Sequence, residues 1–152
     1  MSHPFEPSRF DRSTFEAAPF AQRIEKPWGY ELLFTEPGLP YAGKILHLDA
    51  GRRISLQAHD EKQETQMLVS GRCARIADDR SGTLTEIEMV PYQGYTVMRG
   101  QRHRLVAITD CDIFEVSTPE LGVTWRLSDD YARPDETEDM RNQQRASLPS
   151  SS

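Results

Sequence analysis

Four residues of types that bind metal ions lie in two short stretches of the sequence. Gln57, His59 and Glu64 fall within the stretch 51–71, and His103 follows a later glycine turn. Two imidazoles, one carboxylate and one amide oxygen suit a divalent ion such as Zn, Mn, Fe, Ni or Co. Because glutamine is a neutral, weak ligand, the ion would stay strongly Lewis acidic and keep open positions, as catalytic sites do. These four residues are the predicted metal ligands.

Strands are needed to bring these four residues together. Successive strand residues point to opposite faces, so Gln57 and His59 share one face. A hairpin turn then lets Glu64 return opposite them. The same alternation predicts that Arg53 faces inward with the ligands and that Ile54 faces outward.

Turn residues divide the chain from Tyr30 onward into short runs of strand-forming residues. No segment before residue 134 has a convincing amphipathic helix pattern, so we predict an all-β sandwich or barrel. Residues 134–152 are polar and end in low complexity, which predicts a short helix at most. The expected strands are 29–34, 43–49, 53–59, 64–70, 72–77, 83–89, 94–98, 103–109, 112–117 and 123–128.

The N-terminal segment carries phenylalanine at every fifth position, namely Phe5, Phe10, Phe15 and Phe20. This spacing fits neither the helix period nor the strand period. One interpretation is a solvated tail. The other is an extended arm whose rings fill pockets on the barrel or on a second subunit.

The composition limits the class of protein. The 152 residues suffice for one domain, and the net charge is -6 with scattered basic residues, which argues against nucleic acid as a partner. No apolar run is long enough to span a bilayer and the N-terminus lacks a signal-peptide layout, so we expect no membrane partner and a cytoplasmic location. Cys73 and Cys111 form no metal-like or redox-like pair, so we expect two buried thiols.

The glycine-bounded stretch 51–71 resembles the first motif of the cupin superfamily, G-x5-[H/Q]-x-H-x4-E-x6-G, and fits it without a gap. Gly94, Gly100 and His103 resemble the second cupin motif, with Met98 where proline is common and Ala107 where asparagine is common. The resemblance implies a cupin-type double-stranded β-helix, or jelly-roll barrel, over residues 24–133. An extended N-terminal arm (1–23) would precede it and a polar C-terminal tail (134–152) would follow.

Within the cupins, the chain is similar to the cupin half of type II mannose-6-phosphate isomerases. The similarity lies in K-P-W-G-x-E at 26–31, S-L-Q-x-H at 55–59 and D-x-Y-x-R at 129–133. The ligand set of such isomerases corresponds here to Gln57, His59, Glu64 and His103. The resemblance therefore implies the same metal site that the residue types indicate.

Isomerisation through an enediolate needs a group that moves a proton between adjacent carbons. The cavity-facing candidates are Lys44, Lys62 and Glu115, with a metal-bound hydroxide as an alternative. The arginines that could bind a phosphate or carboxylate are Arg53, Arg102, Arg104, Arg126 and Arg133. Arg133 is preferred because of its motif. We therefore predict Lys44, Glu115 and Arg133 as catalytic residues. Trp28 and Trp125 are expected to be core rings rather than a sugar platform.

Three functions stay open. The first is a metal-dependent isomerase or epimerase of a sugar, sugar phosphate or polyol-like substrate. The second is another metal-cupin enzyme, an oxygenase, lyase or cyclase of a small organic acid, and the third is a non-catalytic ligand-binding module. The substrate could be anionic or sugar-like. A homodimer is expected because the outward faces of the motif strands are apolar, through Ile54, Leu56, Met67, Val69, Val106 and Ile108.

Overall fold

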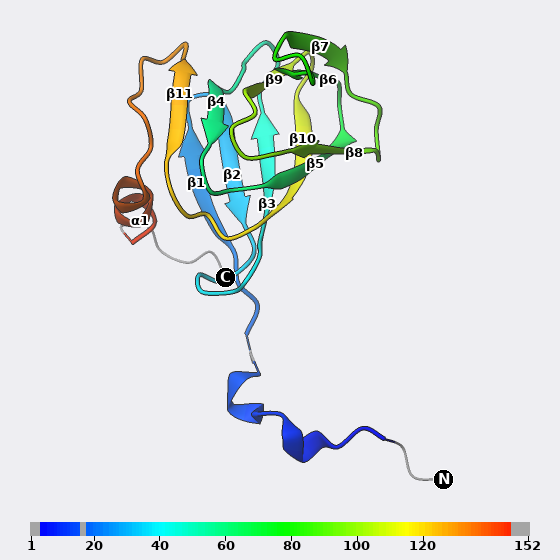
Figure 1. Ribbon diagram of the computed structural model, residues 1–152, viewed down its shortest axis with the longest axis vertical. Helices are drawn as coiled ribbons and strands as arrows, with labels where there is room; N and C mark the ends of the chain where they lie inside the picture. Colours follow the sequence, from blue (N-terminus) through cyan, green and yellow to red (C-terminus); the bar gives the residue numbers. More distant parts are fainter. Residues whose placement is uncertain (1–3, 16–17, 147–152) are drawn as a thin grey trace.

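The computed structural model describes residues 4–15 and 18–146. Two antiparallel sheets form a jelly-roll barrel in this part of the chain (Figure 1). One sheet has six strands in the order β1-β2-β3-β10-β5-β8, and the other has five in the order β11-β4-β9-β6-β7. The predicted all-β barrel is confirmed.

Each predicted strand overlaps an observed one. Strand β1 was not predicted, and it begins at the end of the predicted arm (1–23). The strands of the six-stranded sheet are β1 (Gln22–Lys26), β2 (Gly29–Leu33), β3 (Ala42–Leu48), β10 (Cys111–Ser117), β5 (Glu64–Ser70) and β8 (Gly94–Val97). Those of the five-stranded sheet are β11 (Thr124–Ser128), β4 (Leu56–His59), β9 (His103–Ala107), β6 (Cys73–Asp78) and β7 (Leu84–Glu88).

Two glycines allow close approach of the backbone at strand ends. At Gly29, a Cβ would lie 1.9 Å from the carbonyl oxygen of His47 on the neighbouring strand β3. At Gly71, φ is +75° and a Cβ would lie 2.0 Å from the carbonyl oxygen of Asp110. Both positions therefore exclude residues with a side chain, and Gly71 closes the turn between β5 and β6.

The interior of the barrel has an apolar end and a polar end. Glu115 of β10 pairs in register with Lys44 of β3 and Gln66 of β5. Two residues earlier, Ile113 pairs with Leu46 and Leu68 of the same strands. Each of these strands thus carries charged or amide groups at one end and core residues at the other. The core is formed by Trp28, Leu46, Leu48, Ile54, Leu68, Cys73, Met89, Leu105, Ala107, Cys111 and Ile113.

The start of β4 differs from the prediction. Ile54 and Ser55 are both buried, so the alternation breaks there and the strand begins only at Leu56. The outward orientation predicted for Ile54 is therefore wrong, because this side chain belongs to the core. Arg53 was also placed wrongly, since its guanidinium lies at the surface and donates to Asp130 at 2.6 and 2.8 Å.

The other core predictions have mixed outcomes. Trp28 is buried, but Trp125 is 46% exposed, so the prediction of a core ring is wrong for Trp125. Its neighbour Thr124 is the buried residue of that pair, because adjacent residues of edge strand β11 face opposite sides. Cys73 and Cys111 are buried free thiols, as predicted.

The segments before and after the barrel contain the helices. Two 3-10 helices, η1 (Pro7–Arg9) and η2 (Arg12–Thr14), form an arm that points away from the sheets (Figure 1). The rings of Phe5, Phe10 and Phe15 are 57%, 55% and 65% exposed, so they fill no pocket of this barrel. Helix α1 (Glu138–Ala146) follows the barrel, and it buries Arg141.

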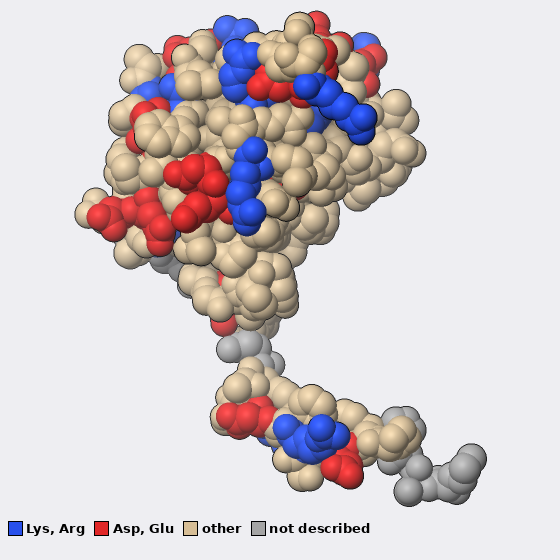
Figure 2. Space-filling view, in the orientation of Figure 1, with Lys and Arg blue, Asp and Glu red and all other residues tan. Residues whose placement is uncertain are grey.

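The described helices include none long and apolar enough to cross a lipid bilayer. Basic side chains form separate groups on the face drawn in Figure 2, with acidic and uncharged residues between them.

Candidate metal centre

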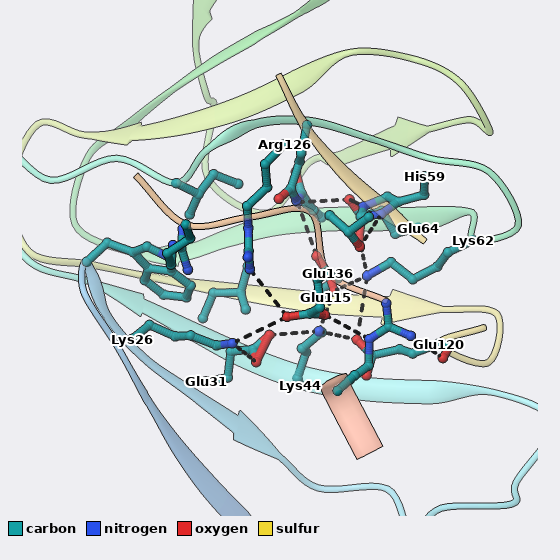
Figure 3. A pocket seen from close by; sticks show the side chains of 18 of the residues that line it. Lys26, Glu31, Lys44, His59, Lys62, Glu64, Glu115, Glu120, Arg126 and Glu136 are labelled. Carbon is teal, nitrogen blue, oxygen red and sulfur yellow. Dashed lines mark hydrogen bonds and ion pairs between the residues drawn. The ribbon is translucent and has the colours of Figure 1, made fainter. Parts of the chain in front are cut away.

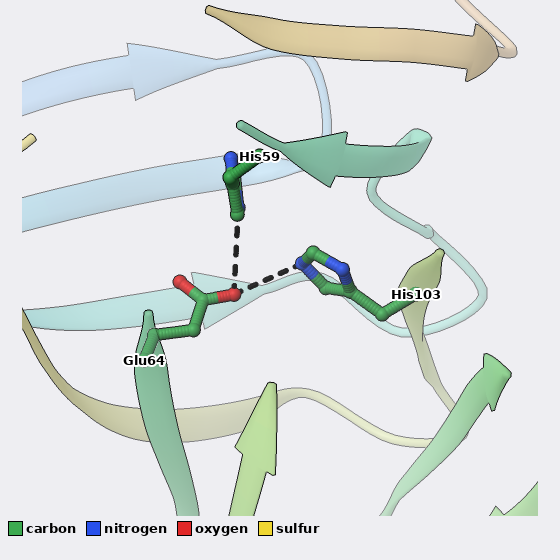
Figure 4. A group of neighbouring side chains, drawn as sticks. All are labelled: His59, Glu64 and His103. Atoms are coloured by element: carbon green, nitrogen blue, oxygen red, sulfur yellow. Dashed lines mark ion pairs between the residues drawn. The ribbon is translucent and has the colours of Figure 1, made fainter. Parts of the chain in front are cut away.

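Three buried side chains converge at the polar end of the barrel. They come from the end of β4 (His59), the start of β5 (Glu64) and the start of β9 (His103) (Figure 4). Glu64 Oε1 lies 2.9 Å from His103 Nε2 and 3.6 Å from His59 Nε2. One donor atom from each residue lies within 4.8 Å of the other two, a spacing at which all three could contact one ion.

Gln57 lies beside this group, because it pairs in register with His103 between β4 and β9. Its amide Nε2 lies 3.5 Å from His103 Nε2, and its Oε1 accepts a hydrogen bond of 2.9 Å from Ser55. Half a turn of the amide would exchange its two terminal atoms and place Oε1 beside His103 Nε2. Gln57 is therefore placed to serve as a fourth, neutral donor.

The hydrogen bonds of the two imidazoles orient their donor atoms inward. His103 Nδ1 donates to the carbonyl oxygen of Gln101 at 2.9 Å, which turns Nε2 toward Glu64. His59 Nδ1 lies 3.1 Å from Thr124 Oγ1, and its Nε2 makes no hydrogen bond with any described residue. A buried nitrogen without a hydrogen bond, beside a carboxylate oxygen, fits a position facing a cation.

The protonation states also suit a metal. Burial, reinforced by the nearby Lys62 ammonium, lowers the pKa of His59 to about 4, so this ring is neutral and able to coordinate. Burial alone would raise the pKa of Glu64, but the Lys62 ammonium and the close contact with His103 hold it well below its usual range. The set therefore combines an ionised carboxylate with a neutral imidazole at physiological pH.

Next to this group, two lysines and several carboxylates form a buried ion cluster (Figure 3). Lys44 Nζ lies 2.9 Å from Glu31 and 3.6 Å from Glu115, and it also pairs with Glu120. Lys62 Nζ lies 3.1 Å from Glu64, 3.7 Å from Glu115 and 3.6 Å from Glu120. The ion cluster and the three-residue group thus share Glu64, and Lys62 pairs with it.

Lys44 and Glu115 differ in their ability to exchange a proton, because their surroundings shift their pKa values differently. Burial alone would lower the pKa of Lys44, but three carboxylates raise it well above its usual value. This side chain stays a cation, which weighs against the role of base that the sequence suggests for it. Burial and the Glu64 carboxylate raise the pKa of Glu115 to about 7, where a carboxyl group can give or accept a proton.

Glu115 is also close to the three-residue group. The amide Nε2 of Gln66 donates to Glu115 Oε1 at 3.1 Å and lies 3.5 Å from Glu64 Oε1. Gln66 and Lys62 therefore each contact both Glu115 and the carboxylate that faces the two histidines.

The predicted anion-binding arginines are all paired with chain groups. Arg133 lines the cavity, and its Nε donates to Asp129 at 2.9 Å. Arg126 also lines the cavity and bonds to the carbonyl oxygen of Pro134 at 2.8 Å. Three others do not line the cavity, namely Arg53, Arg102 and Arg104.

A cavity of about 60 Å³ lies between the three-residue group and the ion cluster. Several of its lining residues are not predicted from the sequence, because they come from segments outside the two cupin motifs. Lys26 and Glu31 are exceptions, since they begin and end the K-P-W-G-x-E motif, and Glu31 shares its face of β2 with the buried Gly29 and Leu33. The unpredicted lining residues with charge are Lys26, Glu31, Glu120, Glu136, Arg141 and Arg145.

Comparisons with known proteins identify the fold. No protein-family model matches the sequence, and no curated protein matches it. Among solved structures, oxalate decarboxylase of Lactobacillus farciminis in its formate complex is similar at 20% identity, with a TM-score of 0.61 over 74% of this chain and 36% of that one. Oxalate decarboxylase of Bacillus subtilis at pH 4.6 has 20% identity and a TM-score of 0.59 over 72% and 31%.

A third similar structure is KdgF from Halomonas sp., at 14% identity and a TM-score of 0.56, covering 76% of this chain and 94% of that one. Together these likenesses show that the barrel has the cupin-type jelly-roll fold. The chain spans about a third of the length of the oxalate decarboxylase chains, 36% and 31%.

Proposed function

We propose that this chain is a metal-dependent cupin enzyme that acts on a small-molecule substrate. A divalent ion would be held by His59, Glu64 and His103, with Gln57 as a fourth ligand. The observation that supports this most strongly is the convergence of three buried donor groups within 4.8 Å of one another. Their hydrogen bonds and protonation states suit coordination rather than a simple polar network.

Isomerisation or epimerisation of a sugar, sugar phosphate or polyol-like substrate is the reaction that we propose. A bound divalent ion would polarise a carbonyl and acidify the adjacent C–H. Glu115 would take the proton from one carbon and return it to the next, because its pKa of about 7 permits both steps at neutral pH. The positively charged Lys44 would hold Glu115 in place. Arg133 would orient an anionic group of the substrate.

The size and charge of the cavity favour a second candidate, an oxygenase, lyase or cyclase of a small organic acid. A space of about 60 Å³ holds roughly two water molecules, which suits a very small ligand. Seven lysine and arginine side chains line this space with five glutamates, and the excess of cations would attract a carboxylate. Two of the similar structures are oxalate decarboxylases, whose name identifies a small organic acid as their substrate.

Two assays on the metal-loaded protein separate these candidates. Protein loaded with Zn or Mn is incubated with aldoses, ketoses and their phosphates in D2O, and NMR follows deuterium at the carbon next to the carbonyl. Incorporation supports isomerisation. Turnover of small organic acids, with O2 uptake after loading with Fe(II), would instead support the second candidate. If both assays fail while a sugar gives a saturable thermal shift, the chain is a non-catalytic binding module.

We also propose a homodimer in the cytoplasm. Five predicted outward side chains remain at least partly exposed on the motif strands or next to them, namely Leu56, Met67, Val69, Val106 and Ile108. Together with the exposed phenylalanines of the arm, they offer apolar surface that a second subunit would cover. The two buried free thiols suit a reducing compartment.

A further inference from the structure

Glu120 is a carboxylate that enters the ion cluster from a loop. It lies between β10 and β11, and its side chain is 7% exposed. Its Oε1 pairs with Lys44 and lies 3.6 Å from Lys62, and its Oε2 pairs with Arg145 (Figure 3). Three cations thus surround one carboxylate within the cavity.

The loop position distinguishes Glu120 from the other carboxylates of the cluster. Glu31, Glu64 and Glu115 lie on β2, β5 and β10, where strand pairing holds their backbone. Glu120 has no strand partner and lies two residues before Gly122, whose φ is +75°. Its side chain can therefore leave the cavity without disturbing a sheet.

Helix α1 holds this loop in place through polar contacts. Arg141 Nη1 donates to the carbonyl oxygen of Glu120 at 2.7 Å, and Glu138 accepts from the backbone N–H of Gly122 at 3.1 Å. Arg145 adds its ion pair with the Glu120 side chain. Arg141 is the buried residue of α1, so charged contacts rather than apolar packing hold the helix. The free energy needed to open such a helix and the loop that it contacts is lower than that needed to open the core strands.

The positive charges around the cavity favour an anion at the position of the Glu120 carboxylate. Seven lysine and arginine side chains and five glutamates line the cavity. Withdrawal of Glu120 would leave Lys44, Lys62 and Arg145 with one carboxylate fewer. The two lysines would keep their other carboxylates, but Arg145 would lose its ion pair. Because a buried cation that loses its partner is destabilising, another anion would bind in place of Glu120.

We infer that Glu120 occupies a built-in anion-binding position, and that a ligand with a carboxylate or phosphate group binds there by displacing the Glu120 side chain. The loop 118–123 would move outward with it and lose its contacts with Arg141 and Glu138 of α1, while Arg145 would stay to bind the ligand. Such displacement rests on the proposed function, since it assumes that the substrate enters this cavity. It narrows the substrate class to small anions and makes Glu120 a residue that sets affinity.

The first test compares Glu120→Gln with the wild type in metal-free buffer containing EDTA. Calorimetric titrations use oxalate, inorganic phosphate and, as a neutral probe, glycerol. We expect Glu120→Gln to bind oxalate or phosphate at least about tenfold more tightly than the wild type, because the competing internal charge is gone. The anion with the larger gain in affinity shows whether the position prefers a carboxylate or a phosphate group. Glu86→Gln, an exposed change on β7, should bind as the wild type does.

Equal or weaker anion binding by Glu120→Gln would overturn the inference, as would an equal gain for glycerol. Metal content is measured separately on the same variant. Because the titration contains no metal, its failure would leave the proposed metal centre standing. Conversely, a chain that binds no metal could still show the gain in anion affinity.

A second test uses the wild-type chain, in case Glu120→Gln folds poorly. Hydrogen exchange is followed by mass spectrometry with and without saturating oxalate or phosphate. Displacement of Glu120 should speed exchange in 118–123 and in α1, because their shared contacts are lost. Exchange in β9 provides the internal reference. Unchanged or slower exchange in both segments would overturn the inference.

Discussion

The ammonium nitrogen of Lys62 lies 3.1 Å from Oε2 of Glu64, while Oε1 of the same carboxylate faces two histidines. One oxygen is thus held by an ion pair, and the other is directed toward the candidate metal position. Lys62 thereby restricts Glu64 to a single donor oxygen and joins the proposed metal centre to the ion cluster.

Removal of either imidazole should remove the metal. We expect His59→Ala and His103→Ala to weaken metal binding by more than about 100-fold, since losing a direct ligand costs more than losing an outer partner. Gln57→Ala should weaken it less, because the amide is neutral. Elemental analysis of protein purified without a His tag checks this. His47→Ala is the control, since that ring pairs with Asp112. Full metal content in His59→Ala and His103→Ala would refute the ligand assignment.

Glu115 should control the pH dependence of turnover. With its pKa raised to about 7, the carboxyl group becomes a base only above that pH, so kcat/KM should rise through pH 7 and then level off. Glu115→Gln should lower turnover by about 100- to 10,000-fold while metal content stays constant. Glu25→Gln, at the surface, is the control. A turnover that Glu115→Gln leaves intact would clear Glu115 of this role.

Lys44 should be essential for stability. Lys44→Met would leave Glu31, Glu115 and Glu120 without their common cation, and breaking a buried ion pair in this way costs about 3–5 kcal/mol. Urea unfolding measures the loss. The control is Arg72→Met, which removes an exposed pair with Glu88 and should cost less than about 1 kcal/mol. Equal losses for the two variants would show that the ion cluster contributes little.

Acid should destabilise the barrel partly through Glu31. Burial alone would raise the pKa of Glu31, but Lys44 and Lys26 lower it from 4.5 to about 2. Its stabilising contribution, roughly 3 kcal/mol, is complete above the unfolded pKa of 4.5 and is lost as the pH falls toward 2. Urea unfolding between these limits should show a smaller decline in Glu31→Gln than in the wild type. Parallel curves for the two proteins would contradict this assignment.

The chain should be a dimer in solution. Light scattering at micromolar concentration should give twice the chain mass of 17.4 kDa. A mass of one chain would exclude the proposed homodimer.

Local alternation explains which parts of the site are predictable. Gln57 and His59 are two residues apart on one strand, and Glu64 follows a hairpin turn, so their common orientation is visible in the sequence. The same rule fails at Ile54, because the chain is irregular just before β4 and two successive residues turn inward. It also leaves Trp125 undecided, since alternation alone does not say which face of an edge strand is covered.

By itself, the sequence determined the strands, their turns and the residues that share a face on each strand, because these features depend on near neighbours in the chain. Only the tertiary structure decided the ionisation of the site. The carboxylates around Lys44 come from β2, from β10 and from the loop that α1 fastens. Since a pKa depends on charges a few ångströms away in space, the change of Lys44 from candidate base to fixed cation appears only after folding.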